Sequence, residues 1–311
     1  MTSINTNVAA MTALMTLSQT NKAMSETQNS ISTGFRVSDP SENAAYWSIA
    51  TTMRSDNAAL STVLDALALS AINDVAYTGT KSAIDVVDEI KSKLVAARQP
   101  GIDRNKIQHE INELQVQLRG IADSATFSGE NWLAVDSGAA NYNPIKTIVS
   151  SFSRVGGAVN IGTISIDIDT TKLFDANDQS GILDTQSTTT NGGVTYSVAG
   201  STDALDISGL SDSANDLADL EQIIGVVDGT ISSMTDSATV LGAANARISI
   251  QKDFIKGLMD AISRGVGQLV DADMNKESVE LQALQVKQQL GVQTLGIANS
   301  SSQTVLQLFR S

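Results

Sequence analysis

The chain has 311 residues, of which 41% are apolar and 4% aromatic, and its formal net charge is −14. So acidic a chain is a poor binder of nucleic acid, because phosphate contacts need clustered lysine and arginine. It has no cysteine, which excludes disulfides, thiolate nucleophiles and cysteine-ligated zinc.

The first stretch, residues 1–35, is almost uncharged: it holds only Lys22 and Glu26, although a free surface helix normally carries many more charges. It has neither the basic start nor the apolar run of a cleavable secretory signal. Apolar residues nevertheless recur at helical spacing, so this stretch predicts a helix with protein neighbours. The stripe consists of Ala10, Leu14, Leu17, Met24, Ile31 and Phe35, with Asn21 and Gln28 between them.

Residues 39–140 are predicted to be mostly helical. Asp39, Pro40 and Glu42 are typical of a helix start with Asp at the N-cap. A break is expected near Gly79, and Pro100-Gly101 indicates a turn. Two apolar stripes predict helices that pack on partners: Leu60, Leu64, Leu67 and Ala71, and then Ile107, Ile111, Leu114, Leu118 and Ile121.

The middle, residues 141–214, is rich in Gly, Ser, Thr and Asp. Ile164, Ile166 and Ile168 alternate with polar residues, which predicts a half-buried strand. Asn191-Gly192 indicates a turn into a second strand. The carboxylates of the pairs Asp167/Asp169 and Asp175/Asp178 are interpreted as solvated loop charges, because they lack the clustered third carboxylate of a calcium loop.

Residues 215–271 carry the longest apolar repeat. Its spacing alternates between 3 and 4 from Leu217 to Leu269, and only Asn245 and Lys252 are polar. This predicts one heptad seam of about 80 Å at ~1.5 Å per residue, which needs partner helices along its length. That length argues against unrelated amphipathic helices in a globular protein. The principal positions are Leu217, Leu220, Ile224, Val227, Ile231, Leu241, Ile248, Ile255 and Ile262.

The last stretch, residues 278–311, contains only Glu280, Lys287 and Arg310 as charges. It is apolar on more than one face, and further copies of the chain are expected to cover these residues, at about 1.5–3 kcal/mol for each fully buried Leu or Ile. An alternative is that both ends are disordered alone and become helical on assembly. The candidate assembly residues here are Leu281, Leu284, Leu290, Leu295, Ile297, Val305, Leu308 and Phe309.

These patterns predict a mainly α protein with a small β-rich insertion. Both chain ends pair as a long antiparallel helical bundle, a coiled-coil rod, and the middle loops out at one end. Residues 1–38 and 272–311 are expected to form terminal helices, residues 39–140 and 215–271 the rod, and residues 141–214 an outward-facing domain.

The sequence lacks the motifs of catalytic, cofactor-binding and metal-binding sites. His109 is the only histidine, and His109-Glu110 lacks the second histidine of a zinc-protease motif because position 113 is Glu. There is no phosphate-binding or dinucleotide-binding glycine motif. We therefore expect no catalytic, cofactor or metal site and no enzyme activity. No run of 18 apolar residues exists, so membrane insertion is not expected either.

Short motifs at both ends resemble bacterial flagellins, of the type found in plant- and soil-associated bacteria. The stretch Ile31 to Val37 is similar to L-S-[ST]-G-x-[RK]-[IV], and Leu241-Gly242-Ala243 to the family's L-G-A. Thr126 to Gly129 matches F-[NS]-G, and Gln303 to Arg310 matches Q-x-V-L-x-L-[LF]-R. The match covers both ends in order and leaves out the middle, a region where flagellins vary.

The resemblance implies a structural subunit that self-assembles into the swimming filament after export by the flagellar type III apparatus. The terminal helices would line the inner tube. The implied partners are further copies, other flagellins, an export chaperone, and the filament cap and hook–filament junction proteins. A junction protein with similar ends is the alternative, and the Thr126–Gly129 and L-G-A matches favour the filament subunit. An enzyme in residues 141–214 is disfavoured, because this stretch has no His, no Glu and no recognisable nucleophile arrangement. A carbohydrate-binding module there is a further alternative, which glycan binding by the isolated segment would support.

Two departures from the family pattern concern innate recognition. Flagellins detected by the animal toll-like receptor carry L-Q-R-x-R-E-L, and the matching stretch here, Ile84 to Ile90, has Val86 and Asp88 in place of the arginines. The epitope recognised by plants has Asp-Asp where Glu42-Asn43 stands. We expect weak or no recognition by animal and plant flagellin receptors.

Overall fold

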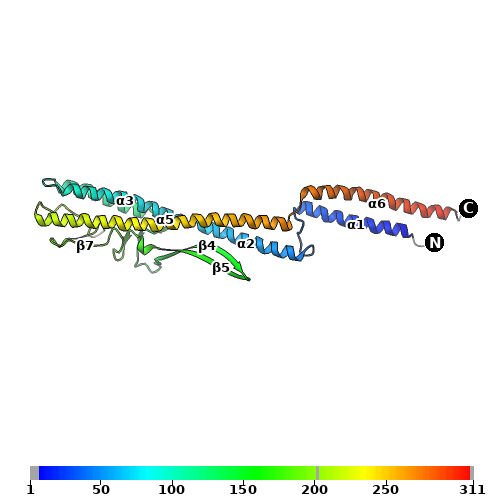
Figure 1. Cartoon of the computed structure of the whole chain (residues 1–311), viewed down its shortest axis with the longest axis horizontal. Helices are drawn as coiled ribbons and strands as arrows, with labels where there is room; N and C mark the ends of the chain where they lie inside the picture. The colour runs from blue at the N-terminus through cyan, green and yellow to red at the C-terminus, as the bar shows by residue number, and fades with distance from the viewer. Residues whose placement is uncertain (1–6, 201–202, 309–311) are drawn as a thin grey trace. The chain divides into compact units, whose positions relative to one another are not determined.

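The computed structural model describes residues 7–200 and 203–308, with side chains as far as residue 300 (Figure 1). The chain forms two compact units. The terminal unit comprises Met1–Ala58 and Leu258–Ser311, and the central unit comprises Ala59–Gly257. Helices α2 (Ala44–Ala68) and α5 (Ala214–Val270) contribute to both units.

The terminal unit contains the helix pair α1 (Val8–Thr33) and α6 (Met274–Leu308). Contacts along the pair show that it is antiparallel: the side chain of Asn7 donates to the carbonyl of Ala298, and the backbone of Ala272 donates to the carbonyl of Gly34. Gly34 ends α1 in the left-handed conformation, with φ of 76°, which a residue without Cβ adopts at no steric cost.

A small apolar core joins the inner ends of these helices to α2 and α5. Val37, Ala50, Val266 and Val270 are buried there, and Trp47 packs against them. The guanidinium of Arg36 donates to the carbonyl of Leu269 at 2.7 Å. This core anchors the chain where α1 leads into α2 and where α5 leads into α6.

The start of α2 differs from the prediction. Asp39 is not the N-cap, because residues 40–42 form a separate turn and the helix begins at Ala44. The carboxylate of Glu42 accepts from the backbone N–H of Ser38 and Asp39, so it closes that turn. The side chain of Asn43 accepts from the backbone N–H of Tyr46 and caps the helix instead.

In the central unit, α3 (Ala71–Ala97) packs antiparallel on α4 (Arg104–Ser124) after the predicted turn at Pro100-Gly101. Ion pairs of Lys91 with Asp228 and of Arg98 with Glu221 join α3 to α5. Of the predicted rod positions, Leu220, Val227, Leu241, Ile248, Ile255, Ile111 and Leu118 are buried, whereas Leu217, Ile224, Ile231, Ile262, Ile107 and Leu114 are half-buried.

The helix break predicted near Gly79 was wrong. The break lies at Leu69 and Ser70, between α2 and α3, and Gly79 lies inside α3. A Cβ added to Gly79 would stand 2.7 Å from Cδ1 of Leu133. The glycine therefore permits close packing of the β-rich segment on α3 and does not interrupt the helix.

The polar residue Asn245 in the seam has a definite partner. Its side-chain oxygen accepts from the amide of Asn73 at 2.6 Å, and the same amide donates to the carbonyl of Leu241 at 3.0 Å. Asn245 in turn donates to Asp74 at 2.7 Å. Asn73 is fully buried, so these bonds form a polar clasp between α3 and α5 inside an otherwise apolar seam.

The β-rich module consists of short two-stranded sheets. The strand pairs are β1 (Thr126–Phe127) with β2 (Glu130–Asn131), β3 (Ala134–Val135) with β6 (Phe174–Asp175), β4 (Ile145–Val155) with β5 (Ala158–Asp167), and β7 (Ser187–Thr188) with β8 (Thr195–Tyr196). Of these four pairs, β3–β6 is parallel and the other three are antiparallel. The predicted alternation is confirmed: Ile164, Ile166 and Ile168 are buried, and the last lies in the 3₁₀ turn η1 (Ile168–Thr170).

Side chains of the helices hold this module in place. Gln108 on α4 donates to the carbonyl of Leu205 and accepts from the N–H of Ile207. Asp219 on α5 accepts from the N–H groups of Asn191 and Gly192 in the β7–β8 turn. These bonds satisfy backbone groups of the irregular segment that strands do not satisfy.

One aspartate of the module is not the solvated charge that the sequence predicted. Asp175 is buried, and its carboxylate accepts from Nζ of Lys172 at 2.7 Å and from the N–H groups of Ser137 and Asn177. Because these donors favour the charged form, they hold the pKa of Asp175 well below its usual range although burial opposes this. The charge is therefore structural.

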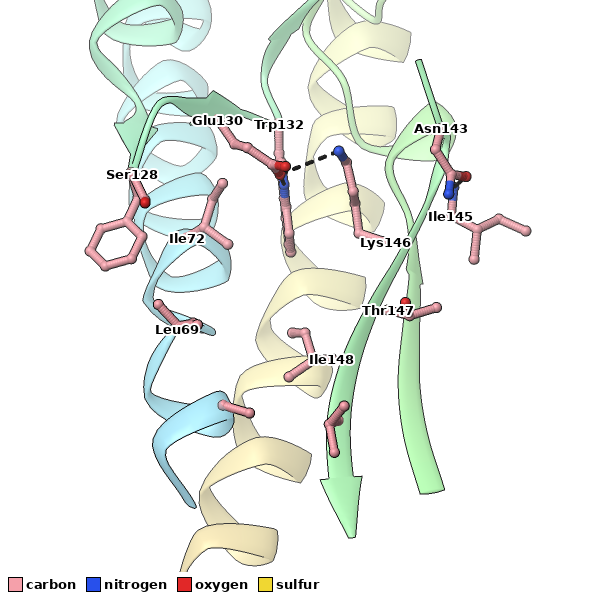
Figure 2. Close-up of a pocket in the computed structure, with 13 residues that line it drawn as sticks. Leu69, Ile72, Ser128, Glu130, Trp132, Asn143, Ile145, Lys146, Thr147 and Ile148 are labelled. Atoms are coloured by element: carbon pink, nitrogen blue, oxygen red, sulfur yellow. Dashed lines mark hydrogen bonds and ion pairs between the residues drawn. The ribbon is translucent and has the colours of Figure 1, made fainter. Parts of the chain in front are cut away.

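The ribbon formed by β4 and β5 stands next to the helices at its base, and Figure 2 shows the groove between them. Leu69, Ile72, Trp132 and Ile148 line this groove of about 500 Å³. At its mouth, Lys146 forms an ion pair with Glu130 at 3.2 Å. The ribbon is thus held at its base and extends beyond it (Figure 1).

A stretch within Ala44–Ala97 is long and apolar enough to cross a membrane, by length and composition alone. Polar residues interrupt this stretch, so it contains no run of 18 apolar residues. In this structure 33% of the apolar stretch is buried, and Leu60 and Leu67 of α2 and Ile90 of α3 lie in the core.

Candidate assembly surface

The contact between α1 and α6 is a narrow seam. The less exposed side chains of α6 alternate at spacings of 3 and 4, as in a coiled coil. They comprise Glu277, Leu281, Leu284, Gln288, Gly291, Leu295 and Ala298, which face Ala10, Ala13, Leu17, Thr20, Met24, Thr27 and Ile31 of α1.

This seam is thinly packed and partly polar. Among its side chains only Thr20, Thr27 and Leu284 are buried. Thr20 donates to the carbonyl of Thr16 in its own helix, and Gln288 donates to Asn21 at 2.8 Å across the pair. Little apolar area is therefore removed from water when the two helices pair within one chain.

The outer face of this hairpin is apolar and exposed. We call the following residues the outer face: Val8, Met11, Leu14 and Met15 on α1, and Val279, Val286, Leu290, Val292 and Ile297 on α6. The only charges of α1 are Lys22 and Glu26, which lie 3.9 Å apart in solvent. So many exposed large apolar side chains on one pair of helices are normally covered by another protein surface.

The structure divides the residues that the sequence suggested for assembly. Ala10, Leu17, Met24, Ile31, Leu281, Leu284 and Leu295 lie in the seam, and Phe35 packs against the small core near Val37. Leu14, Leu290 and Ile297 lie on the outer face. The side chains of Val305 and Leu308, and the whole of Phe309, lie outside the described residues.

Sequence reasoning missed Val8, Met11, Met15 and Val279 as members of the outer face. The predicted stripe covers one side of α1, whereas Val8, Met11 and Met15 lie beside it on a second side of that helix, and Val279 lies on α6. The low charge of the ends was the available signal, because it implied apolar surface on several sides.

The described residues offer little for chemistry. Within residues 7–200 and 203–308 there is no group of three or more His, Asp or Glu side chains that could hold a metal ion. His109 is exposed on α4. What the terminal hairpin can do is bind other apolar surfaces.

A paired helical hairpin with an uncovered apolar face defines a class of structural, self-associating subunit. The comparisons give the family. The bacterial flagellin N-terminal helical region matches residues 4–137, and the C-terminal helical region matches residues 224–309. Over the full length of both chains, the protein is 49% identical to flagellin C of Rhizobium meliloti, 40% to flagellin A of the same strain and 42% to a flagellin of Brucella melitensis.

The chain belongs to the bacterial flagellin family. It is a subunit of the flagellar filament for swimming motility, located outside the cell, and it is a structural protein without enzyme activity. Family membership also implies self-assembly of many copies into the filament.

Proposed function

We propose that the outer face of the α1–α6 hairpin is the surface through which copies of this chain pack in the filament. The observation that carries this proposal is the exposure of nine large apolar side chains on a hairpin whose own seam is thin. Each of them, if fully buried by neighbouring copies, would contribute about 1.5–3 kcal/mol. Spread over several residues, that energy is enough to offset the entropy lost on association.

Leu290, which is 57% exposed, provides the test. We expect Leu290→Lys to abolish filament growth from seeds, because the interface would then bury an unpaired charge. Leu290→Met is the matched control: it keeps an apolar side chain of similar volume and is expected to grow filaments normally. Sedimentation and electron microscopy measure growth, and circular dichroism checks that both monomers keep the same helix content.

Normal filaments from Leu290→Lys would refute the proposal. Failure of Leu290→Met would equally count against it, since apolar character would then not be what the contact needs.

The division of the chain in the filament is part of the same proposal. Residues 1–38 and 272–311 would line the inner tube, residues 39–140 and 215–271 would form the rod around it, and residues 141–214 would face outward. The chain breaks between α1 and α2 and between α5 and α6 lie at these borders and support the division. Protease treatment of intact filaments tests it: cleavage within residues 141–214, with both ends protected, is expected.

The partners before and during assembly follow from the uncovered face. We propose that an export chaperone shields it inside the cell, and that the filament cap and the hook–filament junction proteins receive it at the growing end. Other flagellins with similar terminal helices would co-assemble with this chain. A chaperone complex that left Leu290 and Ile297 open to solvent in hydrogen exchange or labelling would contradict the first of these.

Receptor recognition is proposed to be weak. At the positions of the two arginines of detected flagellins stand Val86, which is buried on α3, and Asp88, which is exposed and negative. A receptor that binds those arginines would meet no positive charge here. A reporter-cell response equal to that of a standard flagellin would refute this, and a peptide of residues 29–50 that triggers a normal oxidative burst in leaf tissue would refute the plant counterpart.

A further inference from the structure

The β4–β5 ribbon has one apolar face near its tip. Phe152 stands opposite Ile161, and Arg154 stands opposite Val159. In an antiparallel pair, opposed residues project from the same face and successive residues from opposite faces. Phe152, Arg154, Val159 and Ile161 therefore share one face, which we call the ribbon face.

The ribbon face is not the face by which the ribbon joins its own chain. Ile164 and Ile166 are buried at the base, and the period of two along β5 puts them on the face of Asn160. The ribbon face continues the opposite row, in which Ser165 is exposed. Ile161 is 63% exposed. These apolar side chains are thus on the side that this chain leaves uncovered.

Helix α5 carries a second uncovered patch in the same unit. Ile250 and Phe254 lie one helical turn apart and are 70% and 61% exposed. Ile248 and Ile255, on the other side of the helix, are buried in the seam. A helix that is apolar on two sides needs a neighbour on each, and the described part of the chain supplies one on the side of Ile248 and Ile255. We call Ile250, Asp253 and Phe254 the α5 patch.

Both patches are exposed at once, so neither covers the other within one chain. A filament of identical chains grows through heterologous contacts, in which two different patches of the subunit are complementary. One pair of opposite charges is available to such a contact: Arg154 lies on the ribbon face, where its guanidinium stands 5.9 Å from the ring centre of Phe152, and Asp253 is exposed next to Phe254. Arg247 and Lys256 are exposed on α5 as well.

We propose that the ribbon face of one copy packs on the α5 patch of a neighbouring copy in the filament. Ile161 and Val159 would then cover Phe254 and Ile250, and Arg154 would pair with Asp253. The inference rests on membership of the flagellin family and is independent of the proposal for the terminal hairpin.

The absence of cysteine makes a cross-linking test direct. Filaments are grown from a mixture of Ile161→Cys and Phe254→Cys chains and then oxidised; a disulfide forms only where two Cα atoms come within about 7 Å. Covalent dimers are expected from the mixture and not from either variant alone. The matched control is Asn160→Cys mixed with Phe254→Cys, because Asn160 is exposed on the opposite ribbon face, and no dimer is expected there.

Filaments that form from the mixture but yield no more dimer than the Asn160 control would overturn the proposal. Dimers from Ile161→Cys alone would also overturn it, since ribbons would then meet ribbons. The terminal hairpin is unaltered in these filaments, so either result leaves the hairpin proposal standing.

A charge exchange supplies a second readout that needs no cysteine, should Phe254→Cys fail to assemble. Arg154→Glu and Asp253→Arg are each expected to raise the critical concentration for growth, and the double variant to restore it towards that of the unaltered chain. If the increases in critical concentration caused by the two single changes simply add in the double variant, the pairing of Arg154 with Asp253 is contradicted.

Discussion

The α1–α6 hairpin and the α3–α4 pair are both antiparallel helix pairs, yet they distribute apolar residues in opposite ways. In α3, Val87, Ile90 and Leu94 are fully buried, and the exposed side carries ion pairs such as Lys93 with Glu110 at 2.6 Å. In the hairpin, the buried seam residues are Thr20, Thr27 and Leu284, while Met11, Leu14, Met15 and Leu290 face outward. The first pair buries its apolar side chains within the chain, and the second leaves apolar side chains that, in our proposal, other copies cover.

The contrast explains how one chain serves two purposes. A rod that keeps its shape before and after export needs its apolar contacts inside the subunit. A surface that joins copies needs its apolar contacts outside it, and few charges, because each buried unpaired charge would weaken the joint.

The largest expected effect tests this contrast directly. Leu94→Ala removes a fully buried side chain from α3 and should lower the free energy of unfolding by about 2–5 kcal/mol. Leu14→Ala, the matched change on the outer face, should alter it by less than about 0.5 kcal/mol and should weaken filament growth instead. Denaturant unfolding of monomers and sedimentation of filaments measure the two effects. Equal destabilisation of the monomer by both changes would break the comparison.

The polar clasp sharpens the account of the rod. Asn245→Leu should destabilise the monomer by about 1–3 kcal/mol, because it removes one acceptor from the buried amide of Asn73. The double variant Asn73→Leu, Asn245→Leu should recover most of that loss, since no buried amide then remains. Thermal unfolding gives both values.

If the clasp also fixes the register of α3 against α5, the double variant should fold well but form filaments that fail to change shape. Normal swimming of cells with the double variant would rule that role out.

The smallest expected effect concerns the β-rich module. Burial raises the pKa of Asp184 above its usual range, and one of its oxygens is buried without a hydrogen-bond partner. A carboxyl group with a raised pKa in the folded state stabilises at low pH and loses that contribution as pH rises through the folded pKa.

Asp184→Asn should therefore raise the stability of the module at pH 7. The difference in stability between the variant and the unaltered chain should vanish as the pH falls below about 3.9, the ordinary pKa of aspartate. Asp206→Asn, at an exposed position, is the control for loss of a charge. The melting temperature across pH provides the measurement. A gain that is the same at all pH values would show that ionisation of Asp184 is not its source.

The sequence predicted those parts of the fold that repeat. The seam of α5 alternates at spacings of 3 and 4 from Leu217 to Leu269, with Asn245 and Lys252 as its polar members, and the rows around Ile164 and Ile111 are equally regular. Single contacts across the chain were not predictable. From the sequence, Gly79 indicates a helix break, but the structure shows that it makes room for Leu133. Asp175 likewise has the pattern of a solvated loop charge, but it is paired with Lys172.

The same limit applies to the assembly surface. Low charge at both ends indicated that a surface exists, but which residues belong to it depends on which side α6 covers. Leu17 and Leu14 are equivalent in the sequence pattern, and only the pairing of the helices separates a seam residue from an outer one.

Oxidative footprinting of methionine tests the central claim most directly. Met11 and Met15 on the outer face are 60% and 64% exposed, and Met234 on α5 is fully buried. Peroxide converts an accessible methionine to its sulfoxide, which mass spectrometry locates. The account predicts that Met11 and Met15 oxidise readily in monomers and are protected in filaments, with Met234 protected in both. Oxidation of Met11 and Met15 at the same rate in filaments as in monomers would contradict it.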